Sequence, residues 1–164
     1  MNPIPTYKVI LVGDGGVGKT TFLNRAMNNA FDAKYIPTLG VEVHPIRIGG
    51  HEQTHAVFNV WDCAGQEKFA GLRDGYYIQA SVAIFAFDLT SHHTFMGLAQ
   101  RVLEVKRMSG DIPFIVLGMK NDLPRDVSHE KVFQFVHPSK YIEISSKSDA
   151  DVRHVFETLL GLLE

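Results

Sequence analysis

The chain has 164 residues, a formal net charge of −2 and a single cysteine. This length predicts one domain, residues 1–164, large enough to bury roughly 70% of the surface that the unfolded chain would expose. The near-neutral charge argues against general attraction to nucleic acid or to anionic lipid, and one cysteine excludes an internal disulfide. We therefore expect a soluble, monomeric globular protein of a reducing compartment, with no direct nucleic-acid partner.

The two ends of the chain predict neither export nor a lipid anchor. Residues 1–5 lack the basic and apolar regions of a signal peptide, and residues 159–164 contain no cysteine for prenylation. No apolar run approaches the roughly 20 residues that a membrane helix requires. We expect no membrane anchor.

The first predicted element is the apolar run 9–12, typical of a buried strand, and a helix-like stretch follows at 21–27. Between them lies the pattern G-x-x-x-x-G-K-[ST], in which glycines take backbone angles closed to other residues and successive N–H groups point at one anion. The positive end of the following helix adds to this attraction. The pattern predicts a phosphate cradle made by Asp14, Gly15, Gly16, Val17, Gly18, Lys19, Thr20 and Thr21.

Two side chains complete this cradle. Lys19 has the reach to bridge the outer phosphates as a point charge, and Thr20 offers a hydroxyl to a Mg²⁺ that bridges the same phosphates. Together they predict a site for a nucleotide with Mg²⁺.

Further along the chain, the stretch 28–40 has no clear periodicity and is interpreted as a functional loop. Residues 41–48 alternate apolar and polar, Gly49-Gly50 turns the chain and residues 56–61 run back, which predicts a hairpin. The runs 82–87 and 114–117 are nearly all apolar, as expected for strands that are covered on both faces of a parallel sheet.

Two later stretches have a helical period, with Ser148 and Asp151 forming a capping pair at the start of the second. Their apolar residues are Phe95, Leu98, Val102 and Val105, and then Val152, Val155, Phe156, Leu159, Leu160 and Leu163. Strands that alternate with helices after such a loop predict an α/β, three-layer P-loop NTPase fold. We expect a six-stranded, mostly parallel sheet with one antiparallel edge hairpin strand, helices on both faces and the nucleotide at the carboxyl ends of the strands.

A second motif follows the predicted hairpin: Asp62-Cys63-Ala64-Gly65-Gln66. Asp62 is then placed beside the cradle, where an acidic side chain can hold Mg²⁺ through water. Gly65 leaves room for an N–H aimed at the terminal phosphate, and Gln66 can orient a water because its amide both donates and accepts. Asp-x-x-Gly alone is an ordinary turn, but with the cradle at this distance it predicts a nucleotide-hydrolysing site.

These motifs resemble those of the Ras-superfamily small GTPases over essentially the whole chain, and within the superfamily they are most similar to the Ran branch, the small GTPases of nuclear transport. The runs that carry the likeness to Ran are residues 13–16, 38–45, 58–62, 66–69 and 71–79. The resemblance implies binding of GTP and GDP with Mg²⁺, and slow GTP hydrolysis that an activating partner accelerates by roughly 10³ to 10⁵.

The resemblance also implies roles for single residues. Thr38 is similar to the threonine that reaches Mg²⁺ and the γ-phosphate, and with Lys19 and Gln66 it makes up the expected catalytic set. Phe31 resembles the aromatic residue that packs against the guanine, although a loop aromatic tucked into the core is the alternative. Tyr35 is expected among the nucleotide contacts.

Base recognition is where the chain departs from the family. The N-K-x-D motif falls on Met119-Lys120-Asn121-Asp122, and Ser145-Ser146-Lys147 resembles the S-A-K motif whose backbone N–H reads the guanine O6. The resemblance implies that Asp122 accepts from guanine N1–H and N2–H₂, which adenine cannot match. A thioether donates nothing to guanine N7, so Met119 should cost about 1 to 3 kcal/mol, or roughly 5- to 150-fold, of affinity.

An ATP-using P-loop enzyme is a third interpretation, which Asp122 disfavours. Two other interpretations stay open. The first is a nucleotide switch in nucleus and cytoplasm, with partners that read the switch regions: karyopherin-type transport receptors, an exchange factor and an activating protein. The second is a Ran mimic that binds transport factors with little or no cycling. Met119 favours the mimic, as does the end of the chain at Glu164, where Ran continues into an acidic tail.

Overall fold

The computed structural model describes residues 3–27, 34–36, 41–50, 53–62 and 75–164. Four residues with expected roles, Phe31, Thr38, Gly65 and Gln66, lie outside these ranges, and Tyr35 is described by its backbone alone. In the described part, no helix is both long and apolar enough to cross a membrane.

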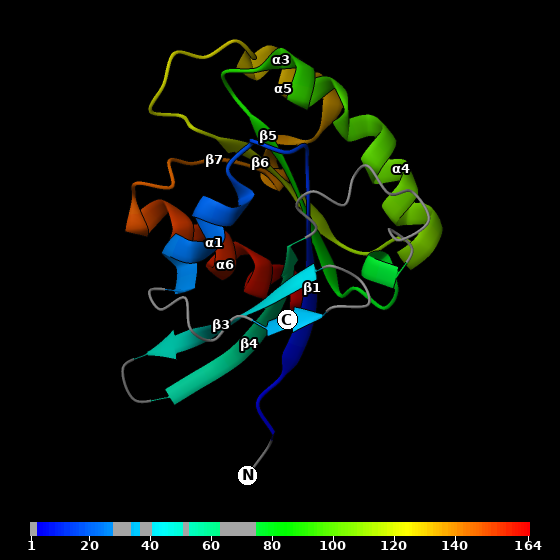
Figure 1. The fold of residues 1–164 in the computed structure, drawn as a ribbon, viewed down its shortest axis with the longest axis vertical. Helices are drawn as coiled ribbons and strands as arrows, with labels where there is room; N and C mark the ends of the chain where they lie inside the picture. The colour runs from blue at the N-terminus through cyan, green and yellow to red at the C-terminus, as the bar shows by residue number, and fades with distance from the viewer. Residues whose placement is uncertain (1–2, 28–33, 37–40, 51–52, 63–74) are drawn as a thin grey trace.

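One mixed sheet forms the middle layer of the molecule (Figure 1). Its strands are β1 (Thr6–Val12), β2 (Lys34–Ile36), β3 (Val41–Gly50), β4 (Gln53–Asp62), β5 (Val82–Asp88), β6 (Phe114–Met119) and β7 (Tyr141–Glu143). Their order is β2-β3-β4-β1-β5-β6-β7. Neighbouring strands from β4 to β7 are parallel, whereas β3 runs antiparallel to β4 and β2 antiparallel to β3. The expected fold class is confirmed. The described sheet has seven strands where six were expected, because the three-residue β2 pairs with β3 and extends the predicted hairpin edge.

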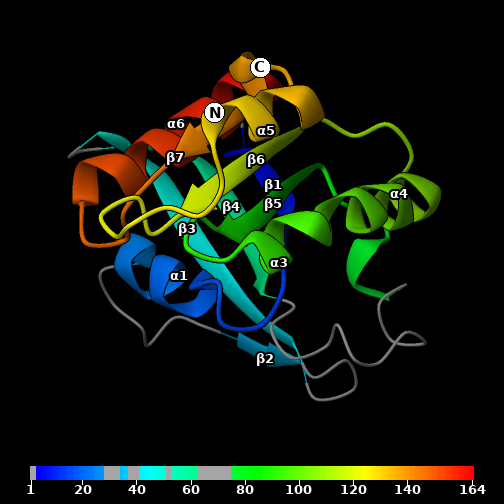
Figure 2. The ribbon, with the colours of Figure 1, turned by 90° about the horizontal axis from the view of Figure 1, so that it is seen from above.

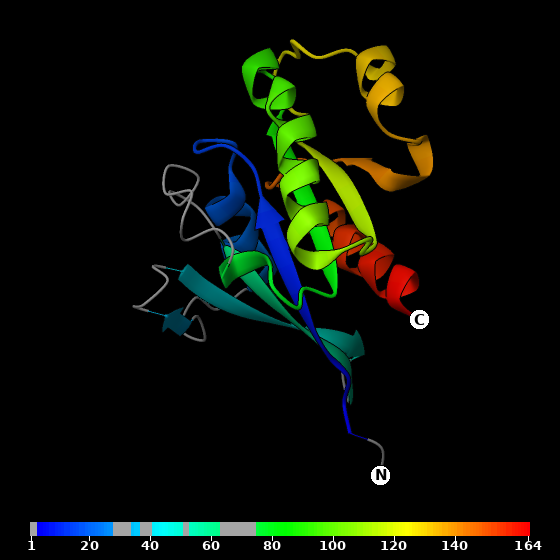
Figure 3. The same cartoon turned by 90° about the vertical axis from the view of Figure 1, so that its right-hand side faces the viewer.

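Helices cover both faces of the sheet (Figure 2, Figure 3). They are α1 (Lys19–Met27), α3 (His92–Met96), α4 (Leu98–Ser109), α5 (His129–Phe135) and α6 (Asp149–Leu163), with a 3-10 turn, η3 (Pro138–Lys140). Apolar residues of α1 and α6 pack into one buried cluster, and those of α3, α4 and α5 belong to a second cluster on the opposite face. Figure 3 shows α4 in front of the sheet and α6 behind it.

The two clusters arise because successive side chains of a strand point to opposite faces. Every residue of β5 is buried: Ile84 packs toward α1 and α6, and its neighbour Phe85 packs toward the other face. Between the sheet and the first helix pair, the rings of Phe22 in α1 and Phe156 in α6 stack with centroids 5.6 Å apart. This packing fixes α1, and with it the start of the phosphate cradle, against the sheet.

The predicted helical stretch from Phe95 to Val105 is two helices, because α3 ends at Met96 and α4 begins at Leu98 with Gly97 as its N-cap. Glycine is a poor helix former, so a helix break at this residue costs little. The elements α5 and β7 are too short to show the periodicity from which sequence reasoning predicts helices and strands.

A P-loop nucleotide site

The phosphate cradle begins where β1 ends, and its first glycine is required by close packing. A Cβ at Gly13 would overlap the carbonyl oxygen of Ala86 in β5. Farther along the loop, Gly16 and Gly18 have φ angles of +83° and +103°, which L side chains rarely adopt. The loop therefore has the backbone geometry that the motif predicted.

The hollow of the loop is a cavity of about 320 Å³. It is lined by Gly15, Gly16, Gly18, Lys19, Thr20, Thr21 and Lys120. The ammonium of Lys19 is buried inside the loop and donates to the carbonyl of Gly13. The structure thus brings most of the predicted phosphate-binding residues together, at the N-terminus of α1, where backbone N–H groups attract anions.

The two described residues that were predicted for Mg²⁺ also meet. The hydroxyl of Thr20 donates to Asp62 Oδ2 over 3.1 Å, and Asp62, at the end of β4, is only 6% exposed. A hydroxyl and a carboxylate are the hard oxygen donors that Mg²⁺ prefers, so this pair fits the ion. Within the described ranges no group of three or more His, Cys, Asp or Glu side chains could hold a metal.

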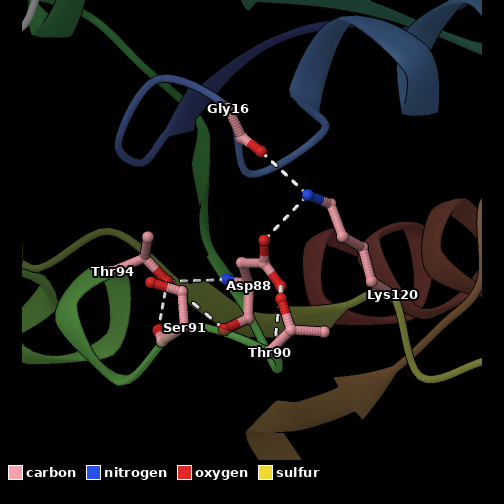
Figure 4. A network of polar contacts seen from close by, with 6 residues as sticks. All are labelled: Gly16, Asp88, Thr90, Ser91, Thr94 and Lys120. Carbon is pink, nitrogen blue, oxygen red and sulfur yellow. Dashed lines mark hydrogen bonds and ion pairs between the residues drawn. The ribbon is translucent and has the colours of Figure 1, made fainter. Parts of the chain in front are cut away.

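Lys120 connects the phosphate cradle to Asp88 at the end of β5 (Figure 4). Its Nζ donates to the carbonyl of Gly16 over 3.0 Å and to Asp88 Oδ2 over 2.7 Å. The other carboxylate oxygen of Asp88 accepts from the N–H and the hydroxyl of Thr90 over 2.8 and 2.6 Å. Burial raises the pKa of Asp88, but the hydrogen bonds from Lys120 and Thr90 outweigh it, so the pKa lies below its ordinary value.

The backbone of Lys120 adopts the left-handed conformation, with φ +65°. A non-glycine residue in this conformation carries a cost of about 1 to 2 kcal/mol. Here the turn directs the side chain back across the site to Gly16, so the two contacts of Lys120 offset the cost. Sequence reasoning found Lys120 through its motif but missed Asp88, whose only signal is an acid at the end of a buried strand.

A larger cavity of about 610 Å³ adjoins the cradle. It is lined by Val17, Gly18, Thr21, Asn24, Arg25, Met119, Lys120, Asp122, Leu123, Ser145, Ser146 and Lys147. Met119 is 1% exposed, and its Cε would lie 3.7 Å from a Cβ built on Gly18. The thioether therefore packs against the phosphate loop and gives this wall of the cavity no hydrogen-bond donor.

The predicted base-reading residues surround the same cavity. Lys147 Nζ lies 3.1 Å from Asp122 Oδ2. The hydrogen bond from Lys147 is the main reason that the pKa of Asp122 lies below its ordinary value. Arg25, which sequence reasoning missed, donates from α1 to the carbonyl of Lys147 over 2.8 Å and pairs with Asp149 over 2.7 Å.

The loop before α6 is held by the predicted capping pair, with one difference. Ser148 accepts from the N–H of Asp151 over 3.2 Å, as expected of an N-cap. The carboxylate of Asp151 accepts instead from the N–H of Ser145 over 3.0 Å, because the loop folds back over the helix start. The segment 145–147, which was predicted to read the base, is thereby fixed to α6.

Asp14 was expected among the nucleotide contacts. Its carboxylate pairs with Arg101 of α4 and is not part of the lining of either cavity described above. Any contribution of Asp14 to the cradle would therefore come from its backbone.

A mostly parallel sheet whose first strand ends in a glycine-rich loop, with a hydroxyl and an acid meeting at the loop and a second cavity beside it, defines a P-loop nucleotide-binding protein. The model of the Ras family matches residues 8–164. The chain therefore belongs to the Ras family, which consists of small GTPases that bind guanine nucleotide, typically with Mg²⁺.

Proposed function

We propose that the chain is a Ran-like molecular switch that holds GTP or GDP and hydrolyses GTP slowly. The observation that supports guanine is Asp122, the only acid among the described residues that line the cavity of about 610 Å³, here called the base cavity. Its carboxylate has two acceptor oxygens, which match the two donors on the edge of guanine and meet no such pair on adenine.

In this proposal, each step of binding is assigned to residues of the chain. The P-loop N–H groups and Lys19 hold the phosphates, and Thr20 together with Asp62, acting through water, holds Mg²⁺. A bound Mg²⁺ would supply neutralisation of the phosphate charge. Thr38 would join the ion in the GTP state, and Gln66 would orient the attacking water, although both lie outside the described residues.

A displacement titration tests the base preference. A fluorescent GDP analogue bound in the presence of Mg²⁺ should be displaced by GTP at a far lower concentration than by ATP. Asp122→Ala should lose most of this difference, and Asp111→Ala, which changes an exposed acid on a distant loop, should keep it. Equal competition by ATP and GTP on the unmodified chain would overturn the assignment.

The transport role rests on the sequence runs shared with the Ran branch. We propose action in nucleus and cytoplasm through karyopherin-type receptors, an exchange factor and an activating protein that read the switch regions. The test is capture of a purified karyopherin by the chain loaded with a non-hydrolysable GTP analogue. Capture that depends on the GTP analogue and fails with GDP would support the switch.

The second candidate is a Ran mimic that binds transport factors with little cycling. It is favoured by Met119, whose thioether lines the cavity next to Gly18 and has no donor of its own. Karyopherin capture that is equal with GDP, with the GTP analogue and without nucleotide would favour the mimic.

A further inference from the structure

The phosphate loop contains a negative charge of its own. Asp14 lies between Gly13 and Gly15, within the loop that has to attract a polyanion. A fixed carboxylate this close to bound phosphates would repel them, and the repulsion would grow with each phosphate added. The loop can serve as a phosphate cradle only if this charge is neutralised or held away.

The structure shows how the charge of Asp14 is held. Arg101 Nη2 donates to Asp14 Oδ1, and the two side chains are 13% and 24% exposed. Charge-assisted hydrogen bonds at such partly buried positions are stronger than surface ion pairs, because water screens them less. Arg101 is the fourth residue of α4, so the pair links the loop after β1 to a helix on the far face of the sheet.

The N-terminal end of α4 also stabilises the negative charge of Asp14. A Cβ built on Gly97, the N-cap of this helix, would lie 3.8 and 3.9 Å from the two carboxylate oxygens of Asp14. The carboxylate therefore lies against the N-terminal end of a 12-residue helix, where the helix dipole favours an anion. A side chain and a helix end thus both act on this one acid.

We propose that Arg101 is a positioning residue of the phosphate site, which neutralises Asp14 and holds its carboxylate against α4, away from the bound phosphates. The inference rests on the proposed nucleotide-binding function. The inference explains why α4 carries a cation at this position. It predicts that loss of Arg101 weakens binding in proportion to the charge of the nucleotide.

The experiment compares the affinities of the full chain for GMP, GDP and GTP by displacement of a fluorescent GDP analogue with Mg²⁺. Arg101→Gln should weaken GDP binding about tenfold, GTP binding more and GMP binding less, because the exposed charge of Asp14 acts on each added phosphate. Asp14→Asn combined with Arg101→Gln should return all three affinities to within about threefold of the unmodified chain.

Arg107→Gln is the matched control, because it removes the same charge from an exposed position in the last turn of α4. It should leave the three affinities unchanged. Thermal melts of each variant separate a loss of folding from a loss of binding. If Arg101→Gln does not fold, Arg101→Lys and Asp14→Asn replace it: the lysine should bind nearly as well as arginine, and Asp14→Asn should favour GTP over GMP more strongly than the unmodified chain does.

Equal loss of all three nucleotides in Arg101→Gln, or no recovery in the double variant, would overturn the inference, since a purely structural pair would behave in this way. The failure of the proposed function looks different. A chain that binds ATP as well as GTP but still shows the phosphate-dependent loss would contradict guanine recognition and leave the role of Arg101 intact.

Discussion

Met119 is the residue at which the predicted N-K-x-D motif is broken. Its side chain lines the base cavity beside Gly18 and offers no donor. Asparagine is smaller and carries two N–H groups, so Met119→Asn should add hydrogen bonds at this wall. We expect release of both GDP and GTP to slow by roughly 5- to 150-fold, measured as the off-rate of a fluorescent nucleotide, because such substitutions act mostly on dissociation.

Met119→Leu is the matched control, since it keeps the volume and apolar character of methionine. Release from this variant should stay close to that of the unmodified chain. If Met119→Asn released nucleotide at the same rate or faster, the base would be held by contacts other than those proposed.

Gln66 is the second residue whose role a single substitution can test. Gln66→Leu should leave nucleotide affinity largely intact and lower GTP hydrolysis, because leucine occupies similar space but cannot orient water. The measurement is the single-turnover rate of bound GTP, with and without an activating protein. An unchanged rate in both conditions would remove Gln66 from this role.

At the scale of elements, the edge strand β7 depends on a polar cluster around Glu143. The two terminal guanidinium nitrogens of Arg125, Nη1 and Nη2, donate to this carboxylate over 3.2 and 2.7 Å, and the hydroxyl of Tyr141 donates to it over 2.6 Å. Burial raises the pKa of Glu143, but the hydrogen bonds from Arg125 and Tyr141 outweigh it and place the pKa below its ordinary value. The cluster fastens the last strand to the loop before α5.

Because the pKa of Glu143 is lowered in the folded chain, its contribution to stability depends on pH. The folded chain holds the ionised form of Glu143 more strongly than the unfolded chain does, so the contribution is present above the unfolded pKa of about 4.5 and is lost as the pH falls through the folded pKa. Glu143→Gln should therefore lower the free energy of unfolding at pH 7 by about 1 to 3 kcal/mol, and by less at acid pH. Urea unfolding at a series of pH values from 7 to 3 measures this difference.

Glu157→Gln serves as the comparison, because Glu157 is an exposed acid of α6. It should change stability by less than about 0.5 kcal/mol at every pH. A difference between Glu143→Gln and the unmodified chain that does not shrink toward pH 3 would show that ionisation of Glu143 is not the cause.

At the scale of the whole molecule, the nucleotide site joins elements from both faces of the sheet. The P-loop leads into α1 on one face, Asp14 reaches α4 on the other, and Lys120 and Ser145 follow strands β6 and β7. A ligand that binds all of these ends in the folded state alone should stabilise the molecule by mass action.

We therefore expect GDP with Mg²⁺, at about 100 times its dissociation constant, to add about 2.7 kcal/mol to the free energy of unfolding. For a chain of this size the expected rise in Tm is about 5 to 10 °C. Removal of Mg²⁺ with a chelator should reverse part of the rise, and ATP at the same concentration should produce little of it. A Tm that does not respond to GDP would contradict the proposed site.

The local parts of the fold could be predicted from the sequence because each depends on near neighbours along the chain. The cradle of residues 13–20, the buried strands β5 and β6, the hairpin of β3 and β4 and the N-cap Ser148 all carry their signal within a few residues. The same local patterns determined the class of ligand, since a glycine-rich loop with lysine and a hydroxyl is already specific for phosphate and metal.

Only the tertiary structure decided which distant polar groups meet. Arg101 lies 87 residues from Asp14 and Lys120 lies 32 residues from Asp88, and the backbone carbonyl of Lys147 that accepts from Arg25 lies 122 residues from it. No periodicity connects such positions, because their proximity depends on the order of the strands in the sheet and on which face each helix covers. The sequence by itself determined a phosphate-binding loop in an α/β sheet, and the packing of that sheet decided that the acid of the loop is paired with α4.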